Sequence, residues 1–232
     1  MRFLLSLLED TLGLIYPNIC ITCGGHLPMG VRYICPGCYH NLPRTNYHLE
    51  RDNAVEQIFW GRVPVKQATA FFHFTKGSKY QKLIHDIKYR GKKELGYELG
   101  KAYGGEISES PFLEADLIVP VPLHKRKQRR RGFNQSEWIA KGLAEAFHKP
   151  LVTEVLYRSA ATQSQTRKSR LERWENVRDA FRIRAIEPFL DKHILLVDDV
   201  VTTGATLEAC TGVLLSCRNA SVSILTLGYA AI

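Results

Sequence analysis

Two adjacent carboxylates followed by a hydroxyl-rich turn are the residues of this chain best suited to chemistry. Asp198 and Asp199 come directly after an apolar run, and the turn that follows contains Thr202, Thr203, Gly204, Ala205 and Thr206. Carboxylates accept hydrogen bonds from vicinal hydroxyl groups, whereas hydroxyl and backbone N–H groups at the start of a helix bind phosphate. Gly204 also allows close approach to the backbone. The pattern therefore predicts a site for a sugar phosphate.

The residues on either side predict how the chain positions these groups. Residues 194–197 are continuously apolar, which suits a central strand buried on both faces of a parallel sheet. Because an unpaired carboxylate is too costly to bury, the aspartates should mark the carboxyl end of that strand, where open α/β sheets bind ligands. From Leu207 onward apolar residues recur at helical spacing, so the turn should lie at a helix N-terminus whose dipole favours anions.

This run resembles the motif with which type I phosphoribosyltransferases bind phosphoribosyl pyrophosphate (PRPP). P-loop ATPases and phosphorelay receiver domains also contain an apolar strand that ends in two aspartates. However, no Gly-x-x-x-x-Gly-Lys-Ser/Thr run precedes the pair, and only 33 residues follow Asp199, too few for a receiver domain. A nucleotide site of another kind and a plain βα turn are the remaining alternatives.

Four cysteines near the N-terminus have the spacing of a structural zinc site. Cys20 and Cys23 form one Cys-x-x-Cys pair, and Cys35 and Cys38 form a second after eleven intervening residues. Four thiolates complete a tetrahedral zinc shell, so the metal would be structural. The alternatives are a pair of disulfides, which are typical of secreted proteins, or free thiols. Residues 3–8 are apolar apart from Ser6 but are followed by acidic residues and no cleavage pattern, so we expect a cytoplasmic protein.

Composition limits the size of the fold and the kind of partner. A chain of 232 residues can hold one α/β domain and a small appendage, and its 45% apolar content permits a proper core. The formal net charge of +9 predicts a polyanionic partner, which could be a substrate with several phosphates, a nucleic acid, or both. No stretch is long enough to span a membrane.

The hydrophobic pattern divides the chain into two parts. Residues 1–50 comprise an amphipathic helix at 2–15 and the zinc module, 51–64 join the parts, and 65–232 form the main domain. The elements expected in the main domain are a strand at 65–74, helices at 77–89 and 93–103, a strand at 116–121, a helix at 136–147, a strand at 151–157, a short helix at 171–177, the strand and helix around the aspartates, and a strand at 221–229.

A basic segment follows the strand expected at 116–121. Six of the seven residues at 125–131 are cationic, so we expect a loop that stays mobile until an anion neutralises it. It could be a solvated loop, a pyrophosphate site or a contact for a nucleic-acid backbone. The candidate binding residues here are Lys125, Arg126, Arg129, Arg130, Arg131, Gly132, Asn134 and Gln135.

Three stretches together resemble the ComF family of phosphoribosyltransferase-like proteins. They are a zinc ribbon at 17–38, an arginine-rich signature at 119–135 and the PRPP motif at 197–206. The resemblance implies the type I phosphoribosyltransferase fold, in which helices flank a mostly parallel α/β sheet, with a small N-terminal four-cysteine zinc module. It covers nearly the whole chain.

The resemblance also implies roles for particular residues. Thr202 to Thr206 would bind the 5-phosphate of PRPP, and Asp198 and Asp199 would bind the ribose and be the catalytic pair. A pyrophosphate bound to Mg²⁺ would lie beside the 123–135 loop. A fourth family stretch matches at Gln165, Arg173, Asn176 and Phe181, of which the first three would belong to a flap. Lys168 stands where the family commonly has an apolar residue.

Two functions are consistent with these observations. The first is an enzyme that transfers ribosyl 5-phosphate from PRPP to an unknown nucleophile. The second is a protein without catalytic activity that uses the PRPP site as a sensor and handles single-stranded DNA during uptake. The family association with bacterial competence favours the second at the cellular level and implies a competence helicase as a partner. No residue is an obvious general base.

Overall fold

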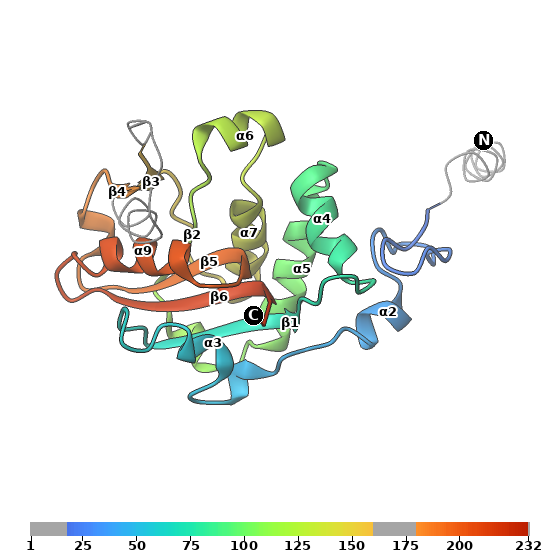
Figure 1. Ribbon diagram of the computed structural model, residues 1–232, viewed down its shortest axis with the longest axis horizontal. Coiled ribbons are helices and arrows are strands. Elements are labelled where there is room, and N and C mark those ends of the chain that lie inside the picture. The colour runs from blue at the N-terminus through green and yellow to red at the C-terminus, as the bar shows by residue number, and fades with distance from the viewer. Residues whose placement is uncertain (1–17, 160–179, 232) are drawn as a thin grey trace, which may run out of the picture.

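The computed structural model describes residues 18–159 and 180–231. At its centre is a four-stranded parallel sheet (Figure 1). The strand order is β1-β6-β5-β2, and all three pairings are parallel. The strands are β1 (Gln67–His73), β2 (Leu117–Pro120), β5 (His193–Val201) and β6 (Ser221–Tyr229). This arrangement confirms the predicted parallel α/β sheet.

Helices cover both faces of the sheet because its inner strands are apolar on both sides. Along β5, Leu195 and Val197 pack into one core cluster and Ile194 and Leu196 into the other, as expected when successive side chains alternate. The first core lies against α4 (Gln81–Tyr89), α5 (Lys93–Glu106) and α7 (Gln135–Phe147). The second lies against α3 (Ala54–Gln57) and α9 (Ala205–Leu214).

Helices α5 and α7 cross at unusually short range. A Cβ atom on Gly100 would lie 2.2 Å from the carbonyl oxygen of Ile139, and one on Gly142 would lie 2.1 Å from that of Tyr97. Because both distances are far below van der Waals contact, only glycine is tolerated at the crossing. The crossing fixes α7, whose first turn reaches the aspartates.

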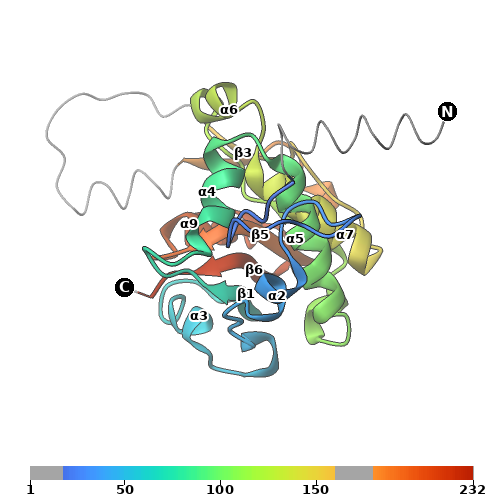
Figure 2. The ribbon, with the colours of Figure 1, turned by 90° about the vertical axis from the view of Figure 1, so that its right-hand side faces the viewer.

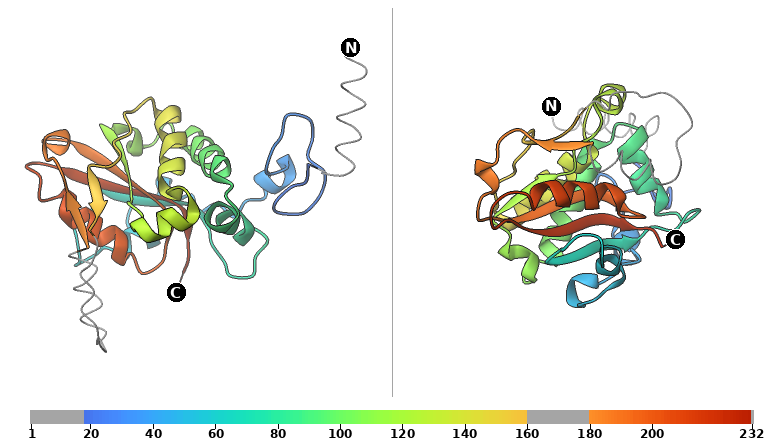
Figure 3. Two further views of the ribbon diagram at one scale, coloured as in Figure 1. Left: turned by 90° about the horizontal axis from the view of Figure 1, so that it is seen from above. Right: turned by 60° about the vertical axis from the view of Figure 1, so that its left-hand side comes forward.

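Residues 18–40, which contain the four cysteines, lie at the end of the molecule farthest from β3 (Leu156–Arg158) and β4 (Phe181–Ile183) (Figure 3). This segment contains α2 (Pro36–His40), which Cys35 caps. Arg44 and Tyr39 fasten it to α5, since both side chains donate hydrogen bonds to the Glu106 carboxylate, at 2.7 Å from Arg44 Nε and 2.6 Å from Tyr39 Oη. The described residues contain no helix long and apolar enough to cross a membrane.

Three segments differ from the sequence-based expectations. The basic segment is a helix, α6 (Lys125–Arg131), rather than a loop, because lysine, arginine and glutamine are good helix formers and His124 Nδ1 accepts a hydrogen bond from the amide of Arg126 at 3.1 Å. Figure 2 shows α6 at the opposite side of the molecule from α3.

The strand expected at 151–157 is also wrong in extent. Leu151 makes only an isolated bridge to Ile118, and β3 pairs with β4 in a separate antiparallel sheet. The segment at 51–64 is likewise more than a join, because it contains α3 and two core residues, Val55 and Phe59. The short 3-10 helices are η1 (Tyr47–Leu49), η2 (Pro111–Glu114) and η3 (Glu187–Phe189).

Candidate functional site

The two aspartates lie within β5 rather than after it. The strand continues to Val201 because neither carboxylate is left without a partner. Asp198 Oδ1 accepts hydrogen bonds from Ser136 Oγ at 2.7 Å and from the backbone amide of Asp199 at 2.8 Å. Asp199 Oδ1 lies 2.8 Å from Lys88 Nζ, on the last turn of α4. The expectation that the aspartates end the strand is therefore wrong by two residues.

The two carboxylates have different electrostatic environments. Burial raises the pKa of Asp198 to about 7, and the charge of Asp199 adds to this rise, against the hydrogen bonds from Ser136 and from the Asp199 amide. Asp199 instead has a cation as its partner. Its second oxygen, Oδ2, is buried and has no hydrogen-bond partner among the described residues. Asp199 Oδ2 therefore has an unmet capacity to accept a hydrogen bond or to bind a metal ion.

The turn after β5 has the geometry of an anion site. Gly204 has φ +73° and is the N-cap residue of α9, while Thr202 and Thr203 are exposed. Within the described part of the chain, no hydrogen bond leads from the backbone amides at 203–206, the groups that the first turn of a helix leaves unpaired. These amides and the helix dipole together favour a phosphate at this position.

Gly204 is required here for space as well as for its conformation. A Cβ atom at this position would lie 2.5 Å from Ile58 Cγ2 and 3.1 Å from the ring of Phe59. The segment that follows α3 is therefore packed directly beneath the turn. Nothing in the local sequence around Ile58 indicates this contact.

The basic candidates divide into exposed and structural residues. Residues 125–130 are exposed on α6, whereas Asn134 and Gln135 are buried. Asn134 Nδ2 donates to the carbonyl of Val121 at 3.0 Å, and Gln135 Oε1 accepts from Arg131 Nη1 at 2.8 Å. These two side chains thus hold the connection between α6 and α7 in place. The flap candidates Gln165, Arg173 and Asn176 lie outside the described residues.

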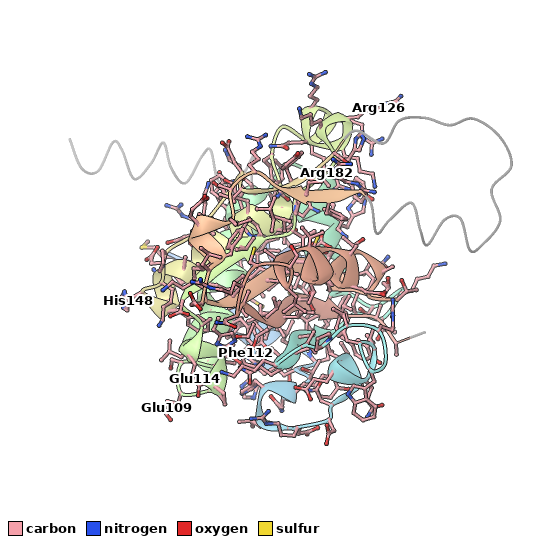
Figure 4. The ribbon with its side chains drawn as sticks, turned by 90° about the vertical axis from the view of Figure 1, so that its left-hand side faces the viewer. Glu109, Phe112, Glu114, Arg126, His148 and Arg182 are labelled. Atoms are coloured by element: carbon pink, nitrogen blue, oxygen red, sulfur yellow. The ribbon has the colours of Figure 1, made fainter. Side chains whose placement is uncertain are left out.

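A second cationic feature lies beside α6. A cavity of about 210 Å³ is lined by Lys125 and Gln128 of α6 and by Tyr157, Arg158 and Arg184 near the β3–β4 sheet. The Arg184 guanidinium lies 5.0 Å from the centre of the Tyr157 ring. Figure 4 shows that Arg126 and Arg182 lie at one end of the molecule and Glu109 and Glu114 at the other.

The four cysteines form one cluster. Their sulfur atoms all lie within 4.8 Å of one another, and Cys23 Sγ is 3.9 Å from Cys35 Sγ. A tetrahedral zinc ion with bonds of about 2.3 Å would place its sulfurs about 3.8 Å apart, so the cluster fits this metal. Backbone amides also point at the sulfurs, as from Cys35 to Cys20 Sγ at 3.4 Å.

These amides favour thiolates. Burial alone would raise the pKa of Cys20, but hydrogen bonds from the backbone of Cys35, Cys23 and Thr22 outweigh it and hold that pKa at about 6. A thiolate is the form that binds a metal ion. The cluster can therefore hold a metal ion, as the spacing of the cysteines predicts.

Comparison with known proteins agrees with these features. Residues 130–231 match the phosphoribosyl transferase domain. The DNA utilization protein YhgH of Escherichia coli is 31% identical over 196 residues, which are 82% of this chain and 81% of that protein. Competence protein F of Haemophilus influenzae is 33% identical over 200 residues, 82% of this chain and 87% of that protein.

This chain belongs to the ComF family of phosphoribosyltransferase-like proteins. Competence protein ComFC of Bacillus subtilis is also similar, at 27% identity over 217 residues, 90% of this chain and 83% of that protein. The ComF chain thus combines a phosphoribosyltransferase-like domain with a four-cysteine cluster near its N-terminus.

Several site residues of this ComF protein have no recognisable signal in the sequence. Lys88, Ser136 and Arg62 all contact the aspartates or the turn from distant parts of the chain. Lys88 is a single lysine on an amphipathic helix, and Ser136 looks like an ordinary residue at a helix start. Only the sheet topology, which brings the end of β5 next to α4 and α7, could have suggested Lys88 and Ser136.

Proposed function

We propose that this ComF protein binds PRPP or a related ribose phosphate at the end of β5. The 5-phosphate would lie on the free amides and hydroxyls at 202–206. The ribose hydroxyls would donate to Asp198 and Asp199. The observation that carries the proposal is the combination of unpaired turn amides with the unpartnered Oδ2 of Asp199, because one ligand with a phosphate and vicinal hydroxyls would satisfy both.

A magnesium ion fits the same residues. Mg²⁺ is a hard cation that takes oxygen ligands and is usually held by one or two carboxylates together with substrate phosphates, which the aspartate pair could supply. When bound, it would neutralise charge on the pyrophosphate as that group leaves C1 of the ribose. The protein's own contribution would be to hold the sugar at Asp198 and Asp199 and to supply cations near the leaving group, from Lys88 and α6.

Transfer of the ribosyl group is the reaction that this binding mode would support. Loss of pyrophosphate from C1 leaves a cation on the sugar, which an ionised carboxylate stabilises. Asp198 has a pKa near neutrality, so its charge, and with it the proposed activity, should increase as the pH rises through about 7. The four cysteines would take no part in this reaction. They would bind a structural zinc ion whose four coordination positions are all filled by sulfur.

A second candidate function is the handling of single-stranded DNA. The exposed cations of α6 and the cavity that pairs Arg184 with Tyr157 offer phosphate contacts and a ring on which a base could stack. The names of the relatives from Escherichia coli and Haemophilus influenzae refer to DNA utilization and competence. DNA binding would use α6 and the cavity beside it, whereas the sugar phosphate would lie at the end of β5, so α6 would contribute to both functions.

Titration calorimetry with PRPP, with and without Mg²⁺, tests the proposed function. We expect the wild-type chain to bind PRPP and the double variant D198N/D199N to lose measurable binding. Arg218→Ala is the matched control, because it removes an exposed ion pair with Asp191, outside the proposed site. Equal affinity of wild type and the double variant would remove the assignment of the aspartates, and no heat with wild type would remove PRPP as the ligand.

A further inference from the structure

The segment that the sequence presents as a join between two parts of the chain forms the underside of the phosphate turn. Ile58 and Phe59 leave no room for a side chain at Gly204, as described above. The next charged residue in this segment, Arg62, reaches the turn itself. Its guanidinium Nη1 donates to the carbonyl oxygen of Thr203 at 2.7 Å and to that of Ile58 at 2.9 Å.

The same guanidinium neutralises an acid at the anion-binding end of α9. Arg62 Nε donates to Glu208 Oε2 at 2.9 Å, and Nη2 contacts the same oxygen. The Glu208 side chain is 13% exposed and lies in the first turn of the helix. An acid there stabilises the helix through its dipole but repels a bound phosphate. The positive charge of Arg62 offsets this repulsion, while Glu208 still interacts favourably with the dipole of α9.

The bond to Thr203 also fixes the direction of an amide. In a trans peptide the C=O and the following N–H point in opposite directions. Because Arg62 holds the carbonyl of Thr203 on its own side of the turn, the N–H of Gly204 must point to the other side. That N–H has no partner within 18–159 and 180–231. It is therefore presented to whatever occupies the turn.

We propose that Arg62 is a positioning residue of the phosphate turn. It sets the orientation of the Thr203–Gly204 peptide so that the Gly204 amide faces the 5-phosphate, and it offsets the charge of Glu208. This inference rests on the proposed function, since it assigns a role within the same sugar-phosphate site. It also assigns a role to the 51–64 segment that its composition does not indicate.

The test compares two ways of breaking one ion pair. Arg62→Ala removes both the carbonyl contacts and the neutralising charge, so PRPP and ribose 5-phosphate should each bind at least tenfold more weakly. Glu208→Gln breaks the same pair but removes the repulsive charge and leaves Arg62 on Thr203, so affinity should be unchanged or higher. A purely structural ion pair would weaken binding to the same extent in both variants.

Two further variants and a second ligand complete the design. Arg62→Lys keeps the charge without the planar fork and should bind with intermediate affinity. In the double variant R62A/E208Q, affinity should recover in part, because only the carbonyl contacts are then missing. Inorganic pyrophosphate, which lacks the sugar phosphate, should bind all variants equally. Thermal unfolding monitored by circular dichroism identifies any variant that fails to fold, in which case Arg62→Lys and Glu208→Gln still decide the question.

The outcomes separate the two proposals. If wild type does not bind PRPP or ribose 5-phosphate, the proposed function fails. If wild type binds both and folded Arg62→Ala binds them equally well, or if Glu208→Gln is weakened as much as Arg62→Ala, the role of Arg62 is overturned while the site itself stands.

Discussion

Asp198→Asn should make the protein more stable while impairing its site. The wild-type carboxyl is held at a pKa of about 7 instead of its usual 3.8, mainly by burial and then by the charge of Asp199. Each pKa unit corresponds to about 1.4 kcal/mol, so above pH 7 the ionised carboxylate costs the fold up to about 4 kcal/mol. Asparagine has nearly the same shape and keeps an oxygen for the hydrogen bonds from Ser136 and from the Asp199 amide.

The expected gain is smaller than this upper value. Asp198 retains some exposure as a residue, so solvent screens part of the cost. We expect Asp198→Asn to raise the free energy of unfolding at pH 8 by about 1 to 3 kcal/mol. The same substitution should weaken PRPP binding, because the side chain loses its charge and one acceptor oxygen. This is the usual conflict between stability and function at a strained site.

The raised pKa of Asp198 also determines how the stability difference between wild type and variant changes with pH. Between about pH 4 and pH 7 the folded wild type holds a proton on Asp198 that the unfolded chain has released, so wild-type stability falls as the pH rises through this window. The variant lacks the Asp198 carboxyl group, so its stability does not fall with pH for this reason. The difference in stability should therefore grow from pH 4 to pH 7 and level off above it.

Urea denaturation of wild type and variant at pH 5, 6, 7 and 8 measures this difference. Asp199→Asn is the matched comparison, because it removes the partner of Lys88 and should destabilise the fold by about 1 to 3 kcal/mol. The reasoning is refuted if Asp198→Asn gains nothing at pH 8, if its gain is the same at pH 5 and pH 8, or if both substitutions stabilise equally.

Four further predictions follow from other contacts. Gly204→Ala should lower the free energy of unfolding by about 1 to 3 kcal/mol, measured by urea denaturation, because of its positive φ and the contact with Ile58; no loss would contradict the packing beneath the turn. Lys88→Met should destabilise the protein at pH 8 by leaving Asp199 buried without a cation, and stability equal to wild type would show that the ion pair does not form in solution. Purified protein should contain about one zinc ion per chain by elemental analysis, and Cys20→Ser should lose it; a folded chain without metal would exclude the structural zinc. Affinity for single-stranded DNA should fall steeply with salt and decrease in R129A/R130A, and binding insensitive to salt would argue against phosphate contacts by α6.

The features that local sequence determines were predictable. The strand at 221–229 and the helix near 136–147 have clear hydrophobic patterns, and the structure contains them as β6 and α7. The cysteine cluster and the turn after β5 follow from residue types at short spacing. In each case the residues that define the feature lie within about twenty positions of one another.

The features that depend on distant contacts were not predictable from the pattern. Lys88 and Asp199 are separated by more than a hundred residues, as are Arg62 and Thr203, and neither pair has a sequence signal of its own. The prediction that the aspartates end β5 failed for this reason, because Ser136 and Lys88 offset the cost of burying the two carboxylates within the strand. At α6 the error was different, because the charge of the segment concealed its high intrinsic helix propensity.

Helix α4 touches both of the chemical centres of this protein. At its N-cap, the hydroxyl of Tyr80 donates to the backbone carbonyls of Asn41 at 2.6 Å and of Cys38, a cysteine of the cluster, at 3.2 Å. Helix α4, which is about 13 Å long, separates Tyr80 from Lys88, the residue that forms an ion pair with Asp199. The cysteine cluster and Asp199 are therefore both in contact with one short helix, which connects the two centres directly.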